Sequence, residues 1–163
     1  MELQILTARP DARAFSLRPA RPADHDALVA LWRRSVEASH GFLAPGALGE
    51  IEAEVRRALP AARELWLAEA SGAPAGFLGC TGAHVDMLFV APEFFRQGVG
   101  TGLLDHARKL HGPLSVEVNE DNAGAAAFYR SRGFAVTGAS PVDSAGRPYP
   151  ILLLRQPDAR GGA

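Results

Sequence analysis

The chain has 163 residues, of which 47% are hydrophobic and 21% charged, and its formal net charge is −1. These values are typical of one soluble globular domain and give no reason to expect binding to nucleic acid or to an anionic membrane. A single cysteine, Cys80, excludes an internal disulfide and a zinc site built on a cysteine pair. The five histidines lack the spacing of a metal motif, so we expect no metal. With no signal-like N-terminus and no long apolar run, a cytoplasmic location is the default expectation.

The first half of the chain predicts a strand followed by two helices. Residues 1–13 are expected to form a flexible leader, and residues 15–18 a short strand. A helix capped by Asp24 is predicted to end near Gly41, because apolar residues recur on one face. A second stripe predicts another helix, stopped by Pro60. The stripes are Leu28, Leu31, Trp32, Ser35 and Val36 in the first helix, and Leu48, Ile51, Val55 and Leu59 in the second.

The second half alternates strands and helices. It predicts strands at 64–70, 75–82, 84–92, 114–119, 135–140 and 148–156, a helix at 98–111, and a helix capped by Asn122 that runs to residue 131. The order β-αα-βββ-α-β-α-ββ indicates an α/β (α+β) domain over residues 14–156, followed by a flexible tail at 157–163. Its single mixed sheet of seven strands is expected to be mostly antiparallel, with parallel pairing where a helix crosses over.

The segment FFRQGVGTG (94–102) places three glycines at the start of a predicted helix. It lacks the lysine of a P-loop. Counting Gly98 as the first position, the sixth is Leu103 rather than the last glycine of a dinucleotide fingerprint. A strand, a glycine turn and a helix N-terminus remain, where outward N–H groups and the helix dipole suit a pyrophosphate. If this segment stood alone, a flexible connection between a strand and a helix would be a simpler interpretation than a phosphate site.

The match is not isolated. LFVAPEFFRQGVG is followed about twenty residues later by VNEDNAGAAAFYRSRGF, and together they resemble the GNAT (GCN5-related) family of acetyl-CoA-dependent N-acetyltransferases. The more specific half is NxxAxxFYxxxGF, and the resemblance covers roughly residues 15–155. SVEASHGFL (35–43) and VDSAGRPYPILLL (142–154) are similar to the bacterial YjaB-like branch. Dimers are common in this family, so a homodimer is a possible assembly.

This resemblance implies an acetyl-CoA site. The pyrophosphate is expected on the amides of the glycine loop, and the pantetheine arm on the backbone of the strand before it. The loop departs from the family pattern, because Phe95 stands where an arginine or glutamine is usual and Arg96 comes one position late. We therefore expect backbone amides and Arg96 to hold the phosphates. The implied cofactor residues are Leu88, Phe89, Val90, Arg96, Gln97, Gly98, Val99, Gly100, Thr101, Asn122 and Tyr129.

The resemblance also implies direct transfer, in which a neutral amine attacks the thioester and the CoA thiolate leaves. Tyr129 matches the family's usual acid; alternatively it is a half-buried aromatic beside Phe128, which is expected to be core. In the strand LSVEVN, Glu117 lies on a polar face and is a candidate base, and an ion pair with an arginine is the alternative. For each of these two residues, both interpretations stay open.

Other polar residues admit two interpretations. His84 and Asp86 share a face of a predicted central strand and are candidates for binding or deprotonating the amine, or else lie at the sheet rim. His40, at the end of the first helix, is a candidate substrate contact or a solvated histidine. Cys80 is expected to be a small core residue rather than a nucleophile.

The predicted function is therefore transfer of an acetyl group to a primary amine, with the YjaB-like likeness favouring a peptidyl lysine. Small-molecule amines such as polyamines, amino acids or aminoglycoside-like drugs are the alternative acceptors. A non-catalytic acyl-CoA sensor is a further alternative.

Overall fold

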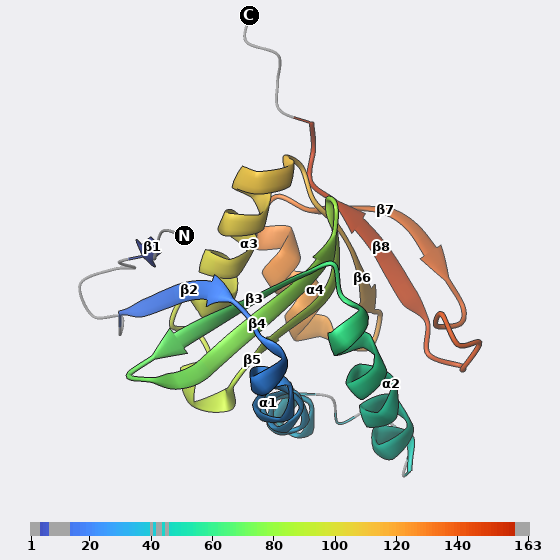
Figure 1. The fold of residues 1–163 in the computed structure, drawn as a ribbon. Helices are drawn as coiled ribbons and strands as arrows, with labels where there is room; N and C mark the ends of the chain where they lie inside the picture. Colours follow the sequence, from blue (N-terminus) through green and yellow to red (C-terminus); the bar gives the residue numbers. More distant parts are fainter. Residues whose placement is uncertain (1–3, 7–13, 40, 42–43, 45, 159–163) are drawn as a thin grey trace, which may run out of the picture.

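The fold was analysed in a computed structural model, which describes residues 4–6, 14–39, 41, 44 and 46–158 (Figure 1). The helices are α1 (His25–Ser39), α2 (Ala47–Ala61), α3 (Val99–His111) and α4 (Ala123–Ser131), with single 3-10 turns η1 (Pro22–Asp24) and η2 (Pro92–Phe94). The strands are β1 (Gln4–Leu6), β2 (Phe15–Pro19), β3 (Glu64–Ala70), β4 (Ala73–Thr81), β5 (His84–Val90), β6 (Ser115–Asn119), β7 (Ala135–Ser140) and β8 (Ile151–Arg155).

All strands belong to one sheet, in the order β1-β2-β3-β4-β5-β6-β8-β7. The seven predicted strands, the four helices and their order along the chain are confirmed. Every neighbouring pair is antiparallel except β5 and β6, which α3 connects by a crossover. An eighth strand, β1, lies in the predicted leader and pairs with β2 through Ile5 and Ser16. Three residues are too short a run for alternation to reveal a strand.

The helices cover both faces of the sheet. A Cβ atom at Gly76 of β4 would meet Val99 and Leu103, so this position faces α3. The next residue, Phe77, points to the opposite face, where its ring packs on Phe89, which in turn contacts Trp32 of α1. Figure 1 shows α3 above the strands β2–β4 and α1, seen nearly end-on, below them.

The sheet opens between its two parallel strands. The ladder between β5 and β6 joins only His84 with Ser115 and Val85 with Val116. Beyond these pairs β5 stays bound to β4, whereas β6 follows β8. The two strands therefore diverge and leave a gap in the sheet with backbone groups along its sides.

Two helix ends differ from the prediction. The carboxylate of Asp24 accepts the N–H of Arg21 at 2.7 Å and the guanidinium of Arg18, so its oxygens serve the preceding turn η1 rather than capping α1. Arg18 accordingly holds the pKa of Asp24 at about 2, below its usual value. Helix α2 continues one residue past Pro60. Because the proline lies in the last turn, its missing N–H removes only one hydrogen bond at the end of the helix.

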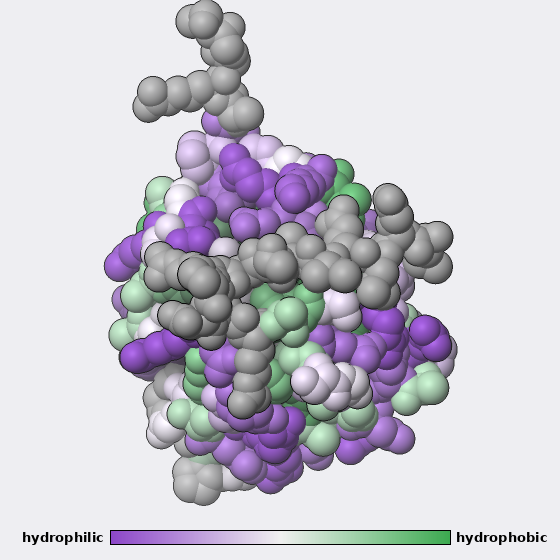
Figure 2. All heavy atoms as spheres, turned by 90° about the vertical axis from the view of Figure 1, so that its left-hand side faces the viewer, coloured by the Kyte–Doolittle hydropathy of each residue, from purple (hydrophilic) through white to green (hydrophobic). Residues whose placement is uncertain are grey.

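Hydrophilic residues dominate the coloured surface of the face shown in Figure 2, and apolar side chains gather mainly near its middle. None of the described helices has the length and apolar composition needed to cross a membrane.

Candidate active site

A cavity of about 540 Å³ occupies the gap between β5 and β6. Its walls come from both strands, from α1, from the turn before α3 and from α4, so distant parts of the sequence meet there. The lining residues are Ser35, Ser39, Val85–Val90, Phe95, Arg96, Gly100, Val116–Asn119, Asn122, Gly124, Ala125, Phe128 and Tyr129.

One end of the cavity is the N-terminus of α3. Gly98 precedes the helix with φ of 85°, a left-handed conformation that favours glycine. The first bond of the helical ladder runs from the Gly102 N–H to the Gly98 carbonyl at 2.9 Å. The N–H groups of Val99, Gly100 and Thr101 therefore have no acceptor within the helix, and with the helix dipole they form an anion site.

Gly100 keeps this end of the cavity open. A Cβ atom there would lie 3.2 Å from the ring of Phe128 and 3.7 Å from Val90, so a larger side chain would fill the space in front of the amides. Arg96 and Phe95 also line the cavity, and Arg96 has a φ of 60°. Gln97 instead turns its amide to the Glu93 carbonyl at 2.9 Å, so its side chain is engaged within the turn.

The free edge of β5 faces the gap. The Ala91 N–H donates to the Ala75 carbonyl, towards β4. Because amides alternate along a strand, the N–H groups of Leu88 and Val90 point the other way, into the space that β6 has left. An extended chain can hydrogen-bond to this edge as an added strand.

Two carboxylates line the opposite end of the cavity. Asp86 comes from β5 and Glu117 from the exposed face of β6, while Val116 and Val118 point into the core. The Asp86 carboxylate accepts the Thr81 hydroxyl at 2.7 Å. No arginine of the described chain forms an ion pair with Glu117, so the alternative of an ion pair finds no support there. Glu120 and Asp121 do not line the cavity.

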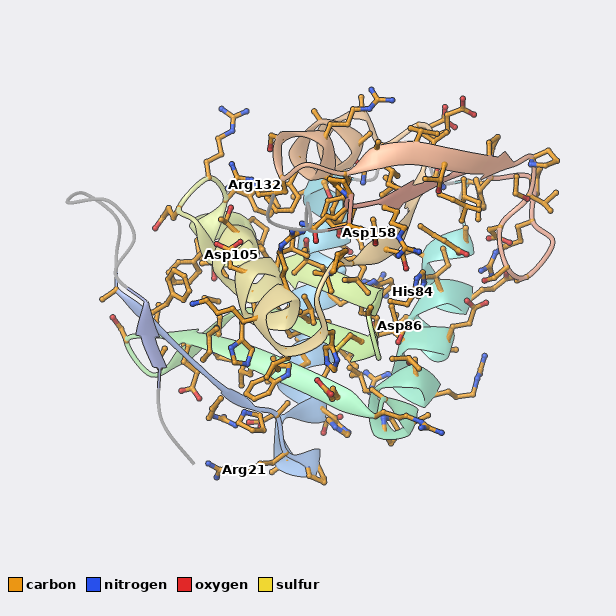
Figure 3. The ribbon with its side chains drawn as sticks, turned by 90° about the horizontal axis from the view of Figure 1, so that it is seen from above. Arg21, His84, Asp86, Asp105, Arg132 and Asp158 are labelled. Atoms are coloured by element: carbon orange, nitrogen blue, oxygen red, sulfur yellow. The ribbon has the colours of Figure 1, made fainter. Side chains whose placement is uncertain are left out.

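His84 lies beside the cavity rather than on its wall. Its Nδ1 is 2.8 Å from the Ser115 hydroxyl, across the short parallel ladder. Figure 3 labels His84 and Asp86 near one end of β5. His84 thus reaches the cavity only through its neighbours, and His40, the other predicted histidine, lies outside the described residues.

The adjacent aromatic residues of α4 take opposite positions. Tyr129 is the more buried, 6% exposed, and packs edge-on against Phe128 and Phe134, yet it still borders the cavity. Phe128, which we expected to be core, is only partly buried and lines the cavity beside Gly100. Burial raises the pKa of the Tyr129 hydroxyl well above its usual value, so the hydroxyl stays protonated at neutral pH, the form that a proton donor requires.

Several lining residues were not predicted. Ser35 was assigned to the apolar stripe of α1, and it is buried, but it and Ser39 border the cavity. A polar residue on an otherwise apolar helix face was the signal that marked this position. Asn119 at the end of β6 was also missed. Asn122 caps α4 as predicted, accepting the Ala125 N–H at 3.0 Å, and borders the cavity as well.

Cys80 is a core residue, as expected. It is fully buried in β4, and this burial raises the pKa of its thiol to about 12, which does not suit a nucleophile.

The Acetyltransferase (GNAT) domain family matches residues 61–136 of the chain. A peptidyl-lysine N-acetyltransferase of Salmonella typhimurium, YjaB, is 43% identical over 88% of this chain and 99% of its own length. The chain belongs to the GNAT acetyltransferase family. It is therefore an acyltransferase with the N-acetyltransferase fold, as the sequence motifs predicted.

Other similar proteins agree with this assignment. The Escherichia coli peptidyl-lysine N-acetyltransferase YjaB is 44% identical over 86% of this GNAT chain and 95% of the relative. The solution structure of apo-form YjaB from Escherichia coli matches with a TM-score of 0.82 and 42% identity, covering 89% and 99% of the two chains. The structure of YncA from Salmonella typhimurium with acetyl-CoA shares the fold, with a TM-score of 0.62, 18% identity and coverage of 91% and 96%.

Proposed function

We propose that this GNAT acetyltransferase transfers the acetyl group of acetyl-CoA to the side-chain amine of a peptidyl lysine, by direct attack in a ternary complex. The observation that carries the proposal is the polarity of the cavity. It presents backbone N–H groups and Arg96 at one end and the carboxylates of Asp86 and Glu117 at the other. An anionic cofactor and a cationic amine match these two ends. The names of the YjaB relatives support lysine as the acceptor.

Acetyl-CoA is proposed to bind along β5. Its pyrophosphate would accept hydrogen bonds from the N–H groups that begin α3, with Arg96 adding charge. The pantetheine arm would pair with the backbone of Leu88 and Val90 as an added strand, which carries it towards Asp86. Val90 lies four positions after Asp86 along β5, which is about 13 Å of extended chain. The remaining proposed contacts are Phe89, Gln97, Gly98, Asn122 and Tyr129.

The chemistry follows from the pKa values of the two reactants. A lysine amine with a pKa of about 10.4 is mostly protonated near neutral pH and has to lose a proton before it attacks. The amine nitrogen then forms a bond to the thioester carbon, and the carbon–sulfur bond breaks. The leaving thiolate takes up a proton, which we assign to the Tyr129 hydroxyl. The proton that the attacking nitrogen loses on becoming an amide returns to Tyr129, so that one proton, the one taken by the base, is released per turnover.

Glu117 is our first choice for the base. Its carboxylate lies on the cavity wall, and no described arginine neutralises it. Asp86 is proposed to bind the ammonium form of the substrate. His84 is proposed to act through Ser115 or water, because it does not line the cavity. The cytoplasmic location, the homodimer, the lack of nucleic-acid and membrane partners, and contact with His40 stay predictions.

A panel of acceptors tests this proposal. The full chain is mixed with acetyl-CoA and a lysine-containing peptide, the same peptide with arginine in place of lysine, a polyamine, an amino acid or an aminoglycoside, and free thiol is followed. We expect free thiol and acetylated product to form in equal amounts with the lysine peptide, and neither to form with the other acceptors. Turnover only with a small amine would replace the acceptor, and acetyl-CoA binding without turnover on any amine would favour a sensor.

A further inference from the structure

A second cluster of reactive side chains lies at the C-terminal end of α3, away from the cavity. It consists of Glu64 from β3, Cys80 from β4 and His111, the last residue of α3. His111 Nε2 is 3.0 Å and Cys80 Sγ 3.5 Å from the same oxygen, Glu64 Oε2. All three atoms lie within 4.8 Å of one another, and none of these residues borders the cavity.

The hydrogen bonds of this cluster converge on one carboxylate oxygen. Trp66 Nε1 also approaches Glu64 Oε2, at 3.4 Å, so one carboxylate oxygen faces three potential donors. A carboxylate offers about four acceptor positions, two on each oxygen. Here all three donors approach the same oxygen. The Trp66 contact is accordingly long for an N–H···O hydrogen bond, whereas 3.5 Å is an ordinary distance for the thiol of Cys80. A cation bound among the three side chains would use the same oxygen, sulfur and nitrogen atoms as direct ligands.

The ligand types and distances suit zinc. Zn²⁺ binds cysteine sulfur at about 2.3 Å and histidine nitrogen or carboxylate oxygen at about 2.0 Å, so its ligand atoms lie about 3.5 Å apart in a tetrahedron. Two of the separations are 3.0 and 3.5 Å, and the third, between Cys80 Sγ and His111 Nε2, is within 4.8 Å, so a bound ion would draw these two side chains closer together. A thiolate and an imidazole favour zinc over magnesium or calcium, which prefer oxygen ligands. The side chains of His111 and Glu64 are 21% and 35% exposed, which leaves a path for the ion and for water as a fourth ligand.

We propose that Glu64, Cys80 and His111 form a Zn²⁺ site that joins β3 and β4 to the end of α3. The ion would connect segments separated by 16 and 31 residues in the sequence and would stabilise the folded chain, since the three ligands converge only there. The site is separate from acetyl transfer, so its test does not depend on the proposed function.

Binding has to displace the thiol proton of Cys80. Burial and the carboxylates of Glu64 and Asp86 raise the pKa of this thiol, so each ion bound near neutral pH releases about one proton.

The experiment uses the full chain without a histidine tag, freed of metal by chelation. Calorimetric titration with Zn²⁺ should show one ion per chain, and zinc should raise the melting temperature. Titration with Co²⁺ should produce the near-ultraviolet band of cobalt–thiolate charge transfer, which identifies Cys80 as a ligand. In His111→Gln the zinc affinity should fall at least tenfold, whereas His25→Gln, on the other face of the sheet, should bind as the natural chain does.

Two results of the zinc titrations would overturn the proposal: no saturable binding of Zn²⁺ to the metal-free chain, or the same affinity in His111→Gln and the natural chain. A cobalt complex without the thiolate band would equally contradict it. Cys80→Ser should abolish that band; if this core variant does not fold, His111→Gln, whose side chain is partly exposed, decides the question.

Discussion

In the proposed function, the two ends of the cavity recognise opposite charges by different means. At the α3 end the binding groups are the N–H groups of Val99, Gly100 and Thr101. These are backbone groups, so a substitution leaves them in place unless its side chain is too large for the space. At the amine end they are the carboxylates of Asp86 and Glu117, which only these residue types supply. We therefore expect anion binding to depend on backbone shape and amine chemistry to depend on side-chain identity.

This difference explains why Phe95 is tolerable where the family usually has an arginine or glutamine. The amides do not need that side chain, and the neighbouring Arg96 reaches the cavity wall. Substitutions at the α3 end should consequently matter when they add bulk, and substitutions at the amine end when they remove a functional group. The four predictions below divide along this line, from the largest expected effect to the smallest.

Tyr129→Phe removes only the proposed acid, because the ring remains packed against Phe128 and Phe134. We expect kcat to fall about 10³-fold, the scale of a general acid, with little change in the Kd of acetyl-CoA. Steady-state thiol release and calorimetry measure the two quantities. Tyr149→Phe, which alters the other tyrosine of the chain, should retain turnover. An unchanged kcat in Tyr129→Phe would remove this residue from the mechanism.

Glu117→Gln should lower kcat/KM for the peptide about 10²-fold at pH 7, because the ammonium substrate loses its base. The deficit should shrink as the pH rises towards the amine pKa of about 10.4, since more of the substrate is then already neutral. A pH profile of kcat/KM measures this recovery. The matched variant Glu120→Gln, next to the cavity but not on its wall, should follow the natural profile. A deficit independent of pH would argue against a base.

Gly100→Val places a side chain between the helix amides and Phe128. A Cβ atom at this position would already lie 3.2 Å from the Phe128 ring. We expect acetyl-CoA affinity to fall about tenfold, the consequence of overpacking this close approach. Calorimetry gives the Kd. Gly49→Val in α2 is the control, because a Cβ atom there meets nothing within 4 Å. Natural affinity in Gly100→Val would mean that the pyrophosphate lies elsewhere.

Arg96→Ala should raise the Kd of acetyl-CoA only about fivefold. The Arg96 side chain is exposed, so its charge adds to the binding by the amides without replacing it. The difference from the natural chain should shrink as salt is added. Lys109→Ala, at the other end of α3, serves as the charge-matched control and should leave the Kd unchanged. If Arg96→Ala abolished binding, the backbone would not be the main phosphate site.

Local patterns were sufficient to predict most of the fold. The stripe of α1 is buried as expected, and the order of strands and helices is confirmed, because periodicity and breakers such as Gly112 are local signals. Boundaries and very short elements were less accessible. Strand β1 has three residues, and the oxygens of Asp24 found Arg18 and the Arg21 N–H instead of the helix.

The candidate site was predictable where a motif carried it. The glycine turn and the polar face of β6 lie where their patterns indicated. Which of two neighbouring rings points inward was not predictable, because Tyr129 and Phe128 differ by about 100° on the helix. The separation of His84 from the cavity and the convergence of Glu64, Cys80 and His111 depend on contacts between distant segments, which no local spacing encodes.

The most direct test of the contrast between the two ends is a paired measurement of acetyl-CoA Kd and of kcat/KM for the lysine peptide in Arg96→Ala and Glu117→Gln. We predict that Arg96→Ala weakens acetyl-CoA and that Glu117→Gln loses turnover while binding acetyl-CoA as the natural chain does. The reverse pattern, with weakened acetyl-CoA binding and full turnover in Glu117→Gln, would contradict the account.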